Sequence, residues 1–482
     1  MKVCVLQPDY STSEVDYKNY DPLRNLKHLL PGYTVENVAL NKLTVYSQLK
    51  KLRKENYDVF VNLCEGYLDW SVPSIDVIHS LDALNLPYTG PTALLYDPPK
   101  TLMKYVATTV NVLTPHFAQV TDAKNLSDKV KHLNFPMFVK PTKAGDSLGV
   151  DDQSLVKDMP SLQKKVESLM DQDYDDILIE DYIGGREFTV LVTANVNPSY
   201  GCTALQPIEY QFPKGFEFKT YALKTSELQH DVNKPCTDKE LDARLRTAAE
   251  KIFNGFDGKG YARMDFRLNE KNEIYFLEIN FTCSVFYTDG YEGSADYILN
   301  NDPIGKSGFL KHIIADGIAR HQAKQKKYRV RADALHGYGI VAQQVISKGD
   351  IIFKMEGTQQ RVITKRYVEK NWTPTQLNDF MHYAYPISEK VFILWDNDPQ
   401  HWAPQNHSCS PNTGYDGLDL IATCDIFIDE ELTLDYADLL DENFEPFQCN
   451  CGSPNCRKLI SGTPGNSITM REVNLSMTVG SI

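Results

Sequence analysis

The sequence has no excess of basic residues. Its 50 Lys and Arg stand against 64 Asp and Glu, which gives a formal net charge of -14 at pH 7. Proteins that capture nucleic acids through the phosphate backbone depend on clustered Lys and Arg, which release bound counterions. We therefore expect no nucleic-acid partner, and we expect basic or zwitterionic partners instead.

Long apolar runs are also missing. No stretch of eighteen or more apolar residues occurs, and the first residues, MKVCVLQPDY, lack the basic-then-apolar layout of a signal peptide. We expect no membrane partner and a cytoplasmic protein. Internal repeats and low-complexity segments are absent as well. A chain of 482 residues with 42% hydrophobic content therefore predicts roughly two to four globular units.

The sequence also lacks the dense, paired cysteines that form the disulfide framework of a small secreted protein. Six of the ten cysteines are scattered singly through apolar or loop sequence, a pattern typical of reduced core thiols. They are Cys4, Cys64, Cys202, Cys236, Cys283 and Cys424. The other four lie in the segments QNHSCSPN and CNCGSPNCR and need a different explanation.

The first quarter of the chain reads as an α/β layer. The apolar runs KVCVLQPDY and YDVFVNLCEG predict strands, and LTVYSQLKKLRKEN between them predicts a helix. We expect a doubly wound arrangement over about 115 residues. Further on, two apolar runs flank Gly184 and Gly185 in DILIEDYIGGREFTVLVTANV and predict a β-hairpin.

Two further strands are expected to carry carboxylates. The segment GYARMDFRLNEKNEIYFLEINF predicts two strands joined by a polar turn at Asn269 to Asn272. Asp265 on the first strand, with Glu278 and Asn280 on the second, offers hard oxygen ligands of the kind that hold Mg²⁺ against nucleotide phosphates. Arg263 shares a strand face with Asp265, since side chains alternate along a strand.

The order of these segments resembles that of ATP-grasp ligases, most closely the D-alanine:D-alanine ligase branch, from residue 1 to about 320. The resemblance rests on NLPYTGPTALLYDPPKTLMK, FVKP, KAGDSLG, IEDYIGGREFTV, ARMDF and LEIN. It implies Mg²⁺ ligands at Asp265, Glu278 and Asn280, and an Arg263 that steadies the acyl phosphate. It also implies an ATP site formed by Lys100, Lys140, Glu180, Asp181, Tyr182, Ile183, Glu187 and Lys219.

Two departures from that branch concern the acceptor end. Ligases that join two D-alanines usually carry a Ser-Ser pair in the Gly loop, where this chain has Asp146 before Ser147. They also carry a Pro-Gly turn after the Asn, where this chain has NFTCSVFYTDG. We therefore keep the reaction type and expect substrates other than D-alanine.

The clustered cysteines predict a zinc site. The Cys-x-Cys-x4-Cys spacing of Cys449, Cys451 and Cys456 supplies three thiolates, one fewer than the tetrahedral shell of structural zinc. Cys409 can supply the fourth ligand.

This arrangement resembles the post-SET region of SET-domain lysine methyltransferases, and HGYGIVA, NHSCSPN and EELTLDYA complete the family pattern. The resemblance implies an S-adenosylmethionine site at Gly337, Tyr338, Gly339, Asn406 and His407, and a catalytic Tyr436. It also suggests that Tyr383 and Tyr385 line a lysine channel and that Phe444 and Phe447 cover the adenine.

The predicted architecture is a multidomain α/β (α+β) chain. Residues 1–115 form an N-terminal α/β domain, residues 116–327 an ATP-grasp domain, residues 328–461 a mostly-β SET plus post-SET domain, and residues 462–482 a tail. From Tyr328 onward there are 12 Lys and Arg against 20 Asp and Glu, an acidic balance that favours a cationic amine substrate.

Three functions remain open. The first is a biosynthetic bifunctional enzyme that joins a small carboxylate to an amine with ATP and Mg²⁺ and methylates a lysine-type amine with S-adenosylmethionine. The second is a protein or histone lysine methyltransferase, nuclear in the histone case, whose ATP-grasp part is a binding module. The third is a ligase with an inactive SET domain. Partners are amino acids or a lysine-containing peptide, and the ligase resemblance implies a homodimer.

Overall fold

The structure is a computed structural model that describes residues 1–11, 21–68, 70–143, 148–197, 199, 201–213, 215, 218, 232–333, 337–354, 361–388, 390–394, 403–438 and 446–462. The chain divides into two units, residues 1–324 and residues 325–482, close to the predicted boundary near Lys327. Among the described residues, no helix is long and apolar enough to cross a membrane.

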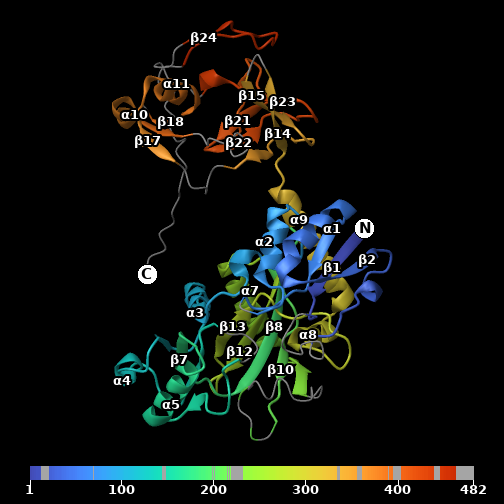
Figure 1. The fold of residues 1–482 in the computed structure, drawn as a ribbon, viewed down its shortest axis with the longest axis vertical. Helices are drawn as coiled ribbons and strands as arrows, with labels where there is room; N and C mark the ends of the chain where they lie inside the picture. The colour runs from blue at the N-terminus through green and yellow to red at the C-terminus, as the bar shows by residue number, and fades with distance from the viewer. Residues whose placement is uncertain are drawn as a thin grey trace. The chain divides into compact units, whose positions relative to one another are not determined.

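The N-terminal part of the first unit, blue in Figure 1, is a three-stranded parallel sheet in the order β2-β1-β3. Its elements are β1 Lys2–Pro8, β2 Thr34–Leu40, α1 Val45–Leu52, β3 Val59–Asn62 and α2 Ile75–Ala83. The two apolar runs noted in the sequence are β1 and β3, and β3 is buried along its whole length. Parallel strands buried on both faces require such continuous apolar sequence.

A second, antiparallel sheet in the order β4-β7-β5-β6 follows, teal in Figure 1. Its elements are β4 Phe117–Val120, α4 Leu126–Lys129, β5 Met137–Pro141, β6 Leu155–Val156, α5 Met159–Met170 and β7 Ile177–Asp181. Helix α5 begins where Asp158 accepts a hydrogen bond from the backbone of Ser161. Leu162, Val166 and Leu169 lie at helical spacing and fill the core beneath this sheet.

The third sheet, green in Figure 1, has the order β11-β10-β8-β12-β13, with β9 beside β8. Its strands are β8 Arg186–Ala194, β9 Cys202–Ala204, β10 Ile208–Tyr210, β11 Asn233–Pro235, β12 Tyr261–Leu268 and β13 Ile274–Asn280. The associated helices are α3 Lys100–Thr109, α7 Lys239–Gly255, α8 Ser294–Asn301 and α9 Gly305–Lys324. Leu241, Leu245 and Ile252 of α7 belong to its buried core.

The predicted hairpin at Gly184 and Gly185 is wrong. Strand β7 pairs with β4 and β5, whereas β8 pairs with β9, β10 and β12, so the two apolar runs belong to different sheets. Gly185 has a φ of +102°, and a Cβ there would lie 2.2 Å from the carbonyl oxygen of Leu268. The glycine therefore redirects the chain from one sheet to the next, since no other residue fits this close approach.

The second unit consists of short strands in small sheets. One four-stranded sheet has the order β14-β15-β23-β20, and three others are β16-β22-β21, β17-β19-β18 and β24-β25. The strands are β14 Tyr328–Asp333, β15 Gly337–Ala342, β16 Ile351–Phe353, β17 Val362–Thr364, β18 Tyr385–Ser388, β19 Val391–Ile393, β20 Asn406–His407, β21 Thr413–Asp416, β22 Asp419–Ala422, β23 Glu431–Leu434, β24 Phe447–Gln448 and β25 Leu459–Ile460. Helices α10 Lys365–Asn371 and α11 Pro374–Tyr383 complete the unit.

All ten cysteines are free of disulfides, as the sequence indicated. Cys4, Cys64, Cys236 and Cys283 are buried, and Cys202 is partly buried. Cys424 is exposed because it lies in the turn that follows β22, so the prediction of a core thiol is wrong for this residue.

Candidate active sites

Strands β12 and β13 bring the predicted metal-binding residues together. Asp265 lies directly opposite Glu278 in the antiparallel register, and Arg263 lies opposite Asn280. Arg263 Nη2 is 3.3 Å from Asp265 Oδ2. Residues paired across adjacent antiparallel strands have side chains on the same face, so the four predicted groups share one face of the sheet.

The donor set fits a magnesium ion. Asp265 Oδ1 is a buried carboxylate oxygen that accepts no hydrogen bond from the described residues. Such an atom needs a partner, because leaving a buried polar group unsatisfied is costly. A divalent cation held by Asp265 and Glu278 would supply that partner, and oxygen ligands are those that Mg²⁺ prefers.

A cleft in the first unit contains most of the predicted ATP-binding residues. Its lining includes Lys100, Lys140, Glu180, Asp181, Tyr182, Ile183, Glu187, Asp265 and Glu278. Lys100 Nζ lies 3.8 Å from Glu278 Oε2, so an ammonium group lies next to the predicted metal ligands. Arg263 and Asn280 lie two register positions further along the strands and are not part of this lining.

Glu180 is held between two buried lysines. Its Oε1 is 2.6 Å from Lys140 Nζ, and its Oε2 is 2.6 Å from Lys104 Nζ. Burial opposes ionisation of Glu180, but the charges of Lys104 and Lys140 outweigh it and lower the pKa of its carboxyl group. Glu180 is therefore an ionised anchor that fixes both ammonium groups. The sequence reasoning missed Lys104, although it lies one helical turn after Lys100 on α3.

Arg267 organises another part of the cleft lining and was also missed. Its guanidinium donates to Glu187 Oε2 at 3.0 and 3.1 Å, to the Tyr182 hydroxyl at 2.8 Å and to the Ile183 carbonyl at 2.8 Å. Alternation along β12 places Arg267 on the same face as Arg263 and Asp265. This period of two was visible in the sequence ARMDFR and could have identified Arg267.

Aromatic rings cover part of the cleft. Phe138 and Tyr182 stack with ring centroids 6.2 Å apart, and Phe218 meets Phe138 edge-on at 5.1 Å. All three line the cleft, so it offers flat apolar surfaces beside its charged wall. A planar base attached to phosphates matches that combination. The predicted phosphate contact Lys219 and the Gly-loop residue Asp146 lie outside the described residues.

The loop after β13 joins a buried charge network from the N-terminal sheet. Arg24 donates to the carbonyl oxygens of Leu63 and Val285, and its Nη1 is 3.3 Å from Glu65 Oε1. The Ser284 hydroxyl donates to the other Glu65 oxygen. Burial raises the pKa of Glu65 to about 7. Ser284 and Val285 belong to NFTCSVFYTDG, so this departure from the ligase pattern carries specific polar contacts.

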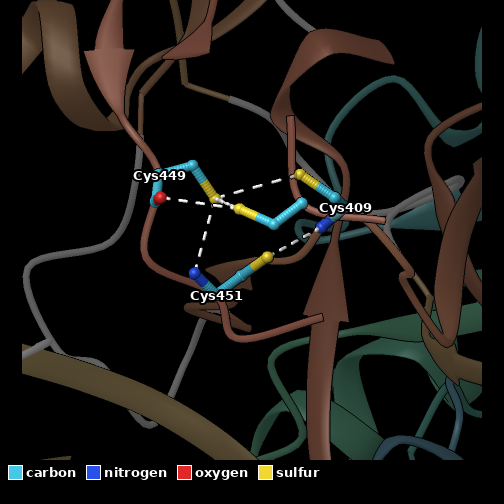
Figure 2. A group of neighbouring side chains, drawn as sticks. Cys409, Cys449 and Cys451 are labelled. Atoms are coloured by element: carbon cyan, nitrogen blue, oxygen red, sulfur yellow. Dashed lines mark hydrogen bonds between the residues drawn. The ribbon is translucent and has the colours of Figure 1, made fainter. Parts of the chain in front are cut away.

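In the second unit the four predicted cysteines meet, and Figure 2 shows Cys409, Cys449 and Cys451 facing one another. The four Sγ atoms lie within 4.8 Å of one another. Cys449 Sγ is 3.9 Å from Cys409 Sγ and 3.7 Å from Cys456 Sγ. Backbone N–H groups of Cys409 and Cys451 donate to Sγ of Cys451 and Cys449, both at 3.4 Å.

This geometry fits zinc. Four thiolates at Zn–S bonds of about 2.3 Å in a tetrahedron are about 3.8 Å apart, close to the observed separations. The backbone N–H donors would stabilise the negative charge that such thiolates carry. The ion would therefore be held by Cys409, Cys449, Cys451 and Cys456. Because the protein supplies all four ligands, the role of the ion would be structural.

His407 links this cluster to the predicted catalytic tyrosine. Its Nδ1 accepts a hydrogen bond from the Tyr436 backbone N–H at 3.1 Å, and its Nε2 is 3.4 Å from Cys409 Sγ. Burial lowers the pKa of His407, so the imidazole is neutral at pH 7. The Tyr436 hydroxyl donates to the carbonyl oxygen of Gln405 at 2.5 Å. Phe447 contacts the rings of both His407 and Tyr436.

The predicted S-adenosylmethionine residues lie on neighbouring strands. Strand β23 pairs with β15 on one side and with β20, which carries Asn406 and His407, on the other. A Cβ on Gly339 would lie 2.8 Å from Asn406 Nδ2, so the missing side chain makes room for Asn406. Tyr338 is exposed, and the side-chain surroundings of Gly337 lie outside the described positions. The fit with the cofactor thus rests on Gly339, Asn406 and His407 being brought together.

The predicted aromatic residues beyond this group have different outcomes. Tyr385 is partly buried, and its ring centroid is 5.2 Å from that of Tyr415. The side chain of Tyr383 and the whole of Phe444 lie outside the described residues.

Comparison with known proteins agrees with the geometry. Residues 106–286 match the family model for the D-ala D-ala ligase C-terminus, and residues 337–437 match the model for the SET domain. The D-alanine–D-alanine ligase of Bacillus velezensis is 26% identical over 344 residues, which are 66% of this chain and 90% of that protein. The D-alanine–D-alanine ligase of Hydrogenovibrio crunogenus is 31% identical over 206 residues, 42% of this chain and 61% of that protein.

A solved structure shares the fold of the first part. The crystal structure of D-alanine–D-alanine ligase from Bacillus anthracis complexed with ATP superposes with a TM-score of 0.50 at 19% identity. The match covers 67% of this chain and 99% of that chain. The chain is therefore an enzyme that joins a D-alanine–D-alanine ligase-like ATP-grasp part to a SET domain.

Proposed function

We propose that the chain is a bifunctional enzyme. Its first unit joins a small carboxylate to an amine with ATP, and its second unit transfers methyl groups from S-adenosylmethionine to a lysine-type amine. The observation that carries the proposal is the cleft in which Asp265 faces Glu278 while Lys100 and Lys140 present ammonium groups. A module that only bound a partner would have no chemical need for this combination.

In the ligase reaction, a substrate carboxylate oxygen attacks the γ-phosphorus of ATP, and ADP leaves with the electrons of the broken P–O bond. The amine then attacks the acyl carbon, and inorganic phosphate leaves. Bound Mg²⁺ would neutralise phosphate charge. Lys100 and Lys140 would bind phosphate oxygens through their ammonium groups. Glu180 fixes the ammonium group of Lys140 in the cleft. We assign Arg263 to the negative charge that develops at the acyl centre.

In the methyl-transfer reaction, a neutral amine nitrogen attacks the methyl carbon, and the sulfonium sulfur leaves with the electron pair of the broken C–S bond. We assign Tyr436 to orienting the amine. Its hydroxyl already has a fixed direction, since it donates to the Gln405 carbonyl oxygen. We assign Gly337, Tyr338, Gly339, Asn406 and His407 to the cofactor, because β15 and β20 flank the strand that leads into Tyr436.

The test combines both activities in one protein. The purified full chain is incubated with ATP, Mg²⁺ and pools of amino acids, with and without S-adenosylmethionine, and ADP release is followed alongside product masses. We expect one pool to stimulate ADP release and to yield a condensed product that gains methyl groups when the methyl donor is present. If no pool stimulates ADP release while an added basic protein gains methyl groups, the chain is a protein methyltransferase with a binding module.

Two variants separate the sites. Asp265→Asn removes a ligand charge and should lower amino-acid-dependent ADP release at least about 100-fold, because metal binding supplies several kcal/mol of transition-state stabilisation. Methyl transfer should remain. Tyr436→Phe should lower methyl transfer about 100-fold, through loss of orientation, and should leave ADP release unchanged. Loss of both activities in either folded variant would contradict the two-site assignment.

A further inference from the structure

Arg457 contacts both the cysteine cluster and the segment that carries Tyr436. Its backbone N–H donates to Cys409 Sγ at 3.4 Å, and its position directly after Cys456 fixes it to the cluster. Its guanidinium Nη2 lies 2.5 Å from Asp435 Oδ1. Arg457 therefore connects the predicted metal ligand Cys409 to Asp435, the residue that precedes Tyr436.

Asp435 in turn shapes the turn that holds Tyr436. Its Oδ1 accepts a hydrogen bond from the backbone N–H of Ala437 at 3.0 Å, at the start of the 3-10 turn Tyr436–Asp438. The carboxyl group is mostly buried, with a side-chain exposure of 13%. A buried carboxylate that accepts hydrogen bonds from both a guanidinium group and a backbone N–H holds the backbone of this turn in place, because charge-assisted hydrogen bonds are short and directional.

The charges around Asp435 show why the arginine is needed. Asp438 lies at the other end of the same short turn and repels the Asp435 carboxylate, and His407 Nδ1 is 3.7 Å from Asp435 Oδ1. His407 Nδ1 already accepts the Tyr436 backbone N–H at 3.1 Å, so this nitrogen does not donate a hydrogen bond to Asp435. Within the described part of the second unit, the guanidinium of Arg457 is the cation paired with this carboxylate.

We propose that Arg457 is a positioning residue that couples the four-cysteine cluster to Tyr436 through Asp435. Occupancy of the cluster by zinc then sets the orientation of the Tyr436 turn, in addition to holding the C-terminal segment in place. This inference rests on the proposed methyltransferase function, but the link itself is a property of the fold. Outer contacts of this type around metal ligands typically change activity by about 10- to 100-fold when removed.

The test uses Arg457→Gln and Arg457→Lys in the full chain, with Arg329→Gln as the matched control. Arg329 makes the same kind of ion pair in the same unit, with Nη2 2.5 Å from Asp429 Oδ1, but its side chain and that of Asp429 are 53% and 70% exposed. We expect Arg457→Gln to retain zinc and to lower kcat for methyl transfer about tenfold. Arg457→Lys should restore part of the loss, and Arg329→Gln should match the wild type.

A double variant tests the route through Asp435. If Arg457 acts through this carboxylate, Arg457→Gln combined with Asp435→Asn should be no slower than Asp435→Asn alone. Additive losses would overturn the proposal, as would zinc loss from both Arg457 variants, because Arg457 would then only hold the cluster together.

Hydrogen exchange gives a readout that does not depend on activity. In the wild type, removing zinc with a chelator should raise amide exchange at Tyr436–Asp438. In Arg457→Gln the same segment should exchange faster with zinc still bound, while Cys449 and Cys451 stay protected. Unchanged exchange at Tyr436–Asp438 would overturn the link. If the wild type methylates no amine but this exchange pattern appears, the proposed function fails and the link stands.

Discussion

The two units stabilise their sites by different means. In the ligase unit, the cleft is built from buried ion pairs: Glu180 between Lys104 and Lys140, and Glu187 with Arg267. In the SET unit, four thiols form one cluster, and His407 connects this cluster to the predicted catalytic Tyr436. Ion pairs within one chain are complete as soon as the chain folds. A group of four thiolates is complete only with a cation, because like charges at 4 Å repel one another.

Of the two units, the SET unit is the one whose structure would depend on a bound metal. The ligase unit would take up Mg²⁺ with its nucleotide, on a strand pair that is already formed by β12 and β13. In the SET unit, the C-terminal hairpin of β24 and β25 is only two residues long on each side. Such a hairpin is not stable alone. Its position therefore depends on the cluster.

Breaking the cluster should produce the largest effect. Cys449→Ser, or treatment of the wild type with a zinc chelator, should abolish methyl transfer and remove the thermal transition of the SET unit, because structural zinc supplies folding free energy directly. With Mg²⁺ present, ADP release by the ligase unit should stay within about twofold of the wild type, since the ion pairs of Glu180 and Glu187 need no zinc. Calorimetry with both assays checks this.

The control is Cys424→Ser, which alters an exposed cysteine of the same unit outside the cluster. It should behave as the wild type in both assays. If removal of zinc lowered ligase activity as much as methyl transfer, the ligase unit would also depend on the cysteine cluster, and the expected difference between the two units would be wrong.

Breaking an ion pair in the ligase unit should have the next largest effect. Lys104 is completely buried and donates to the Thr114 hydroxyl as well as facing Glu180. Lys104→Met should lower the free energy of unfolding by about 3 to 5 kcal/mol, because it leaves a buried carboxylate with one partner instead of two. Urea denaturation of the full chain, followed at the ligase unit's transition, measures the change.

The chain offers a matched control for this variant. Lys129 forms an ion pair with Asp122 at 2.8 Å, but both side chains are at least one-third exposed. Lys129→Met should cost no more than about 1 kcal/mol. If the two variants were equally destabilised, burial would not be what makes the Glu180 pairs matter.

The sequence predicted the parts of both sites that depend on local spacing. Alternation along the strand that carries ARMDF placed Arg263 and Asp265 on one face, and the Cys-x-Cys-x4-Cys spacing needed only one further ligand, Cys409. Apart from the assignment of Cys409, these inferences used neighbours two to seven residues apart, over which strand and turn geometry are fixed.

Long-range pairing was not accessible in the same way. Arg267 and Glu187 are 80 residues apart, and nothing in either segment identifies the other. The apolar runs on either side of Gly185 look like a hairpin locally, but the partners available in other parts of the chain assign β7 and β8 to separate sheets. Nothing in the sequence distinguishes Arg457 beyond its place after Cys456, since its partner Asp435 belongs to another motif.

The smallest expected effect concerns Glu65, a second carboxylate of the ligase unit that is mostly buried. Glu65 is paired with Arg24 but, unlike Glu180, has a raised pKa, because burial outweighs the single arginine. Its pKa in the folded protein, about 7, lies above the ordinary value of 4.5. The folded state therefore binds a proton more tightly than the unfolded state. The contribution of Glu65 to stability is fully present below pH 4.5 and is lost as the pH rises through 7.

Glu65→Gln should remove this pH dependence. The difference in unfolding free energy between pH 4.5 and pH 8 should change by on the order of 3 kcal/mol relative to the wild type, measured by urea denaturation at both pH values. Glu270→Gln removes the same charge from an exposed position and is the control. If Glu65→Gln showed the same difference in unfolding free energy between the two pH values as the wild type, Glu65 would not titrate in this range. Arg24 and Ser284 would then compensate the burial of Glu65 as fully as Lys104 and Lys140 compensate that of Glu180. Both carboxylates would then be permanently ionised parts of one preorganised unit.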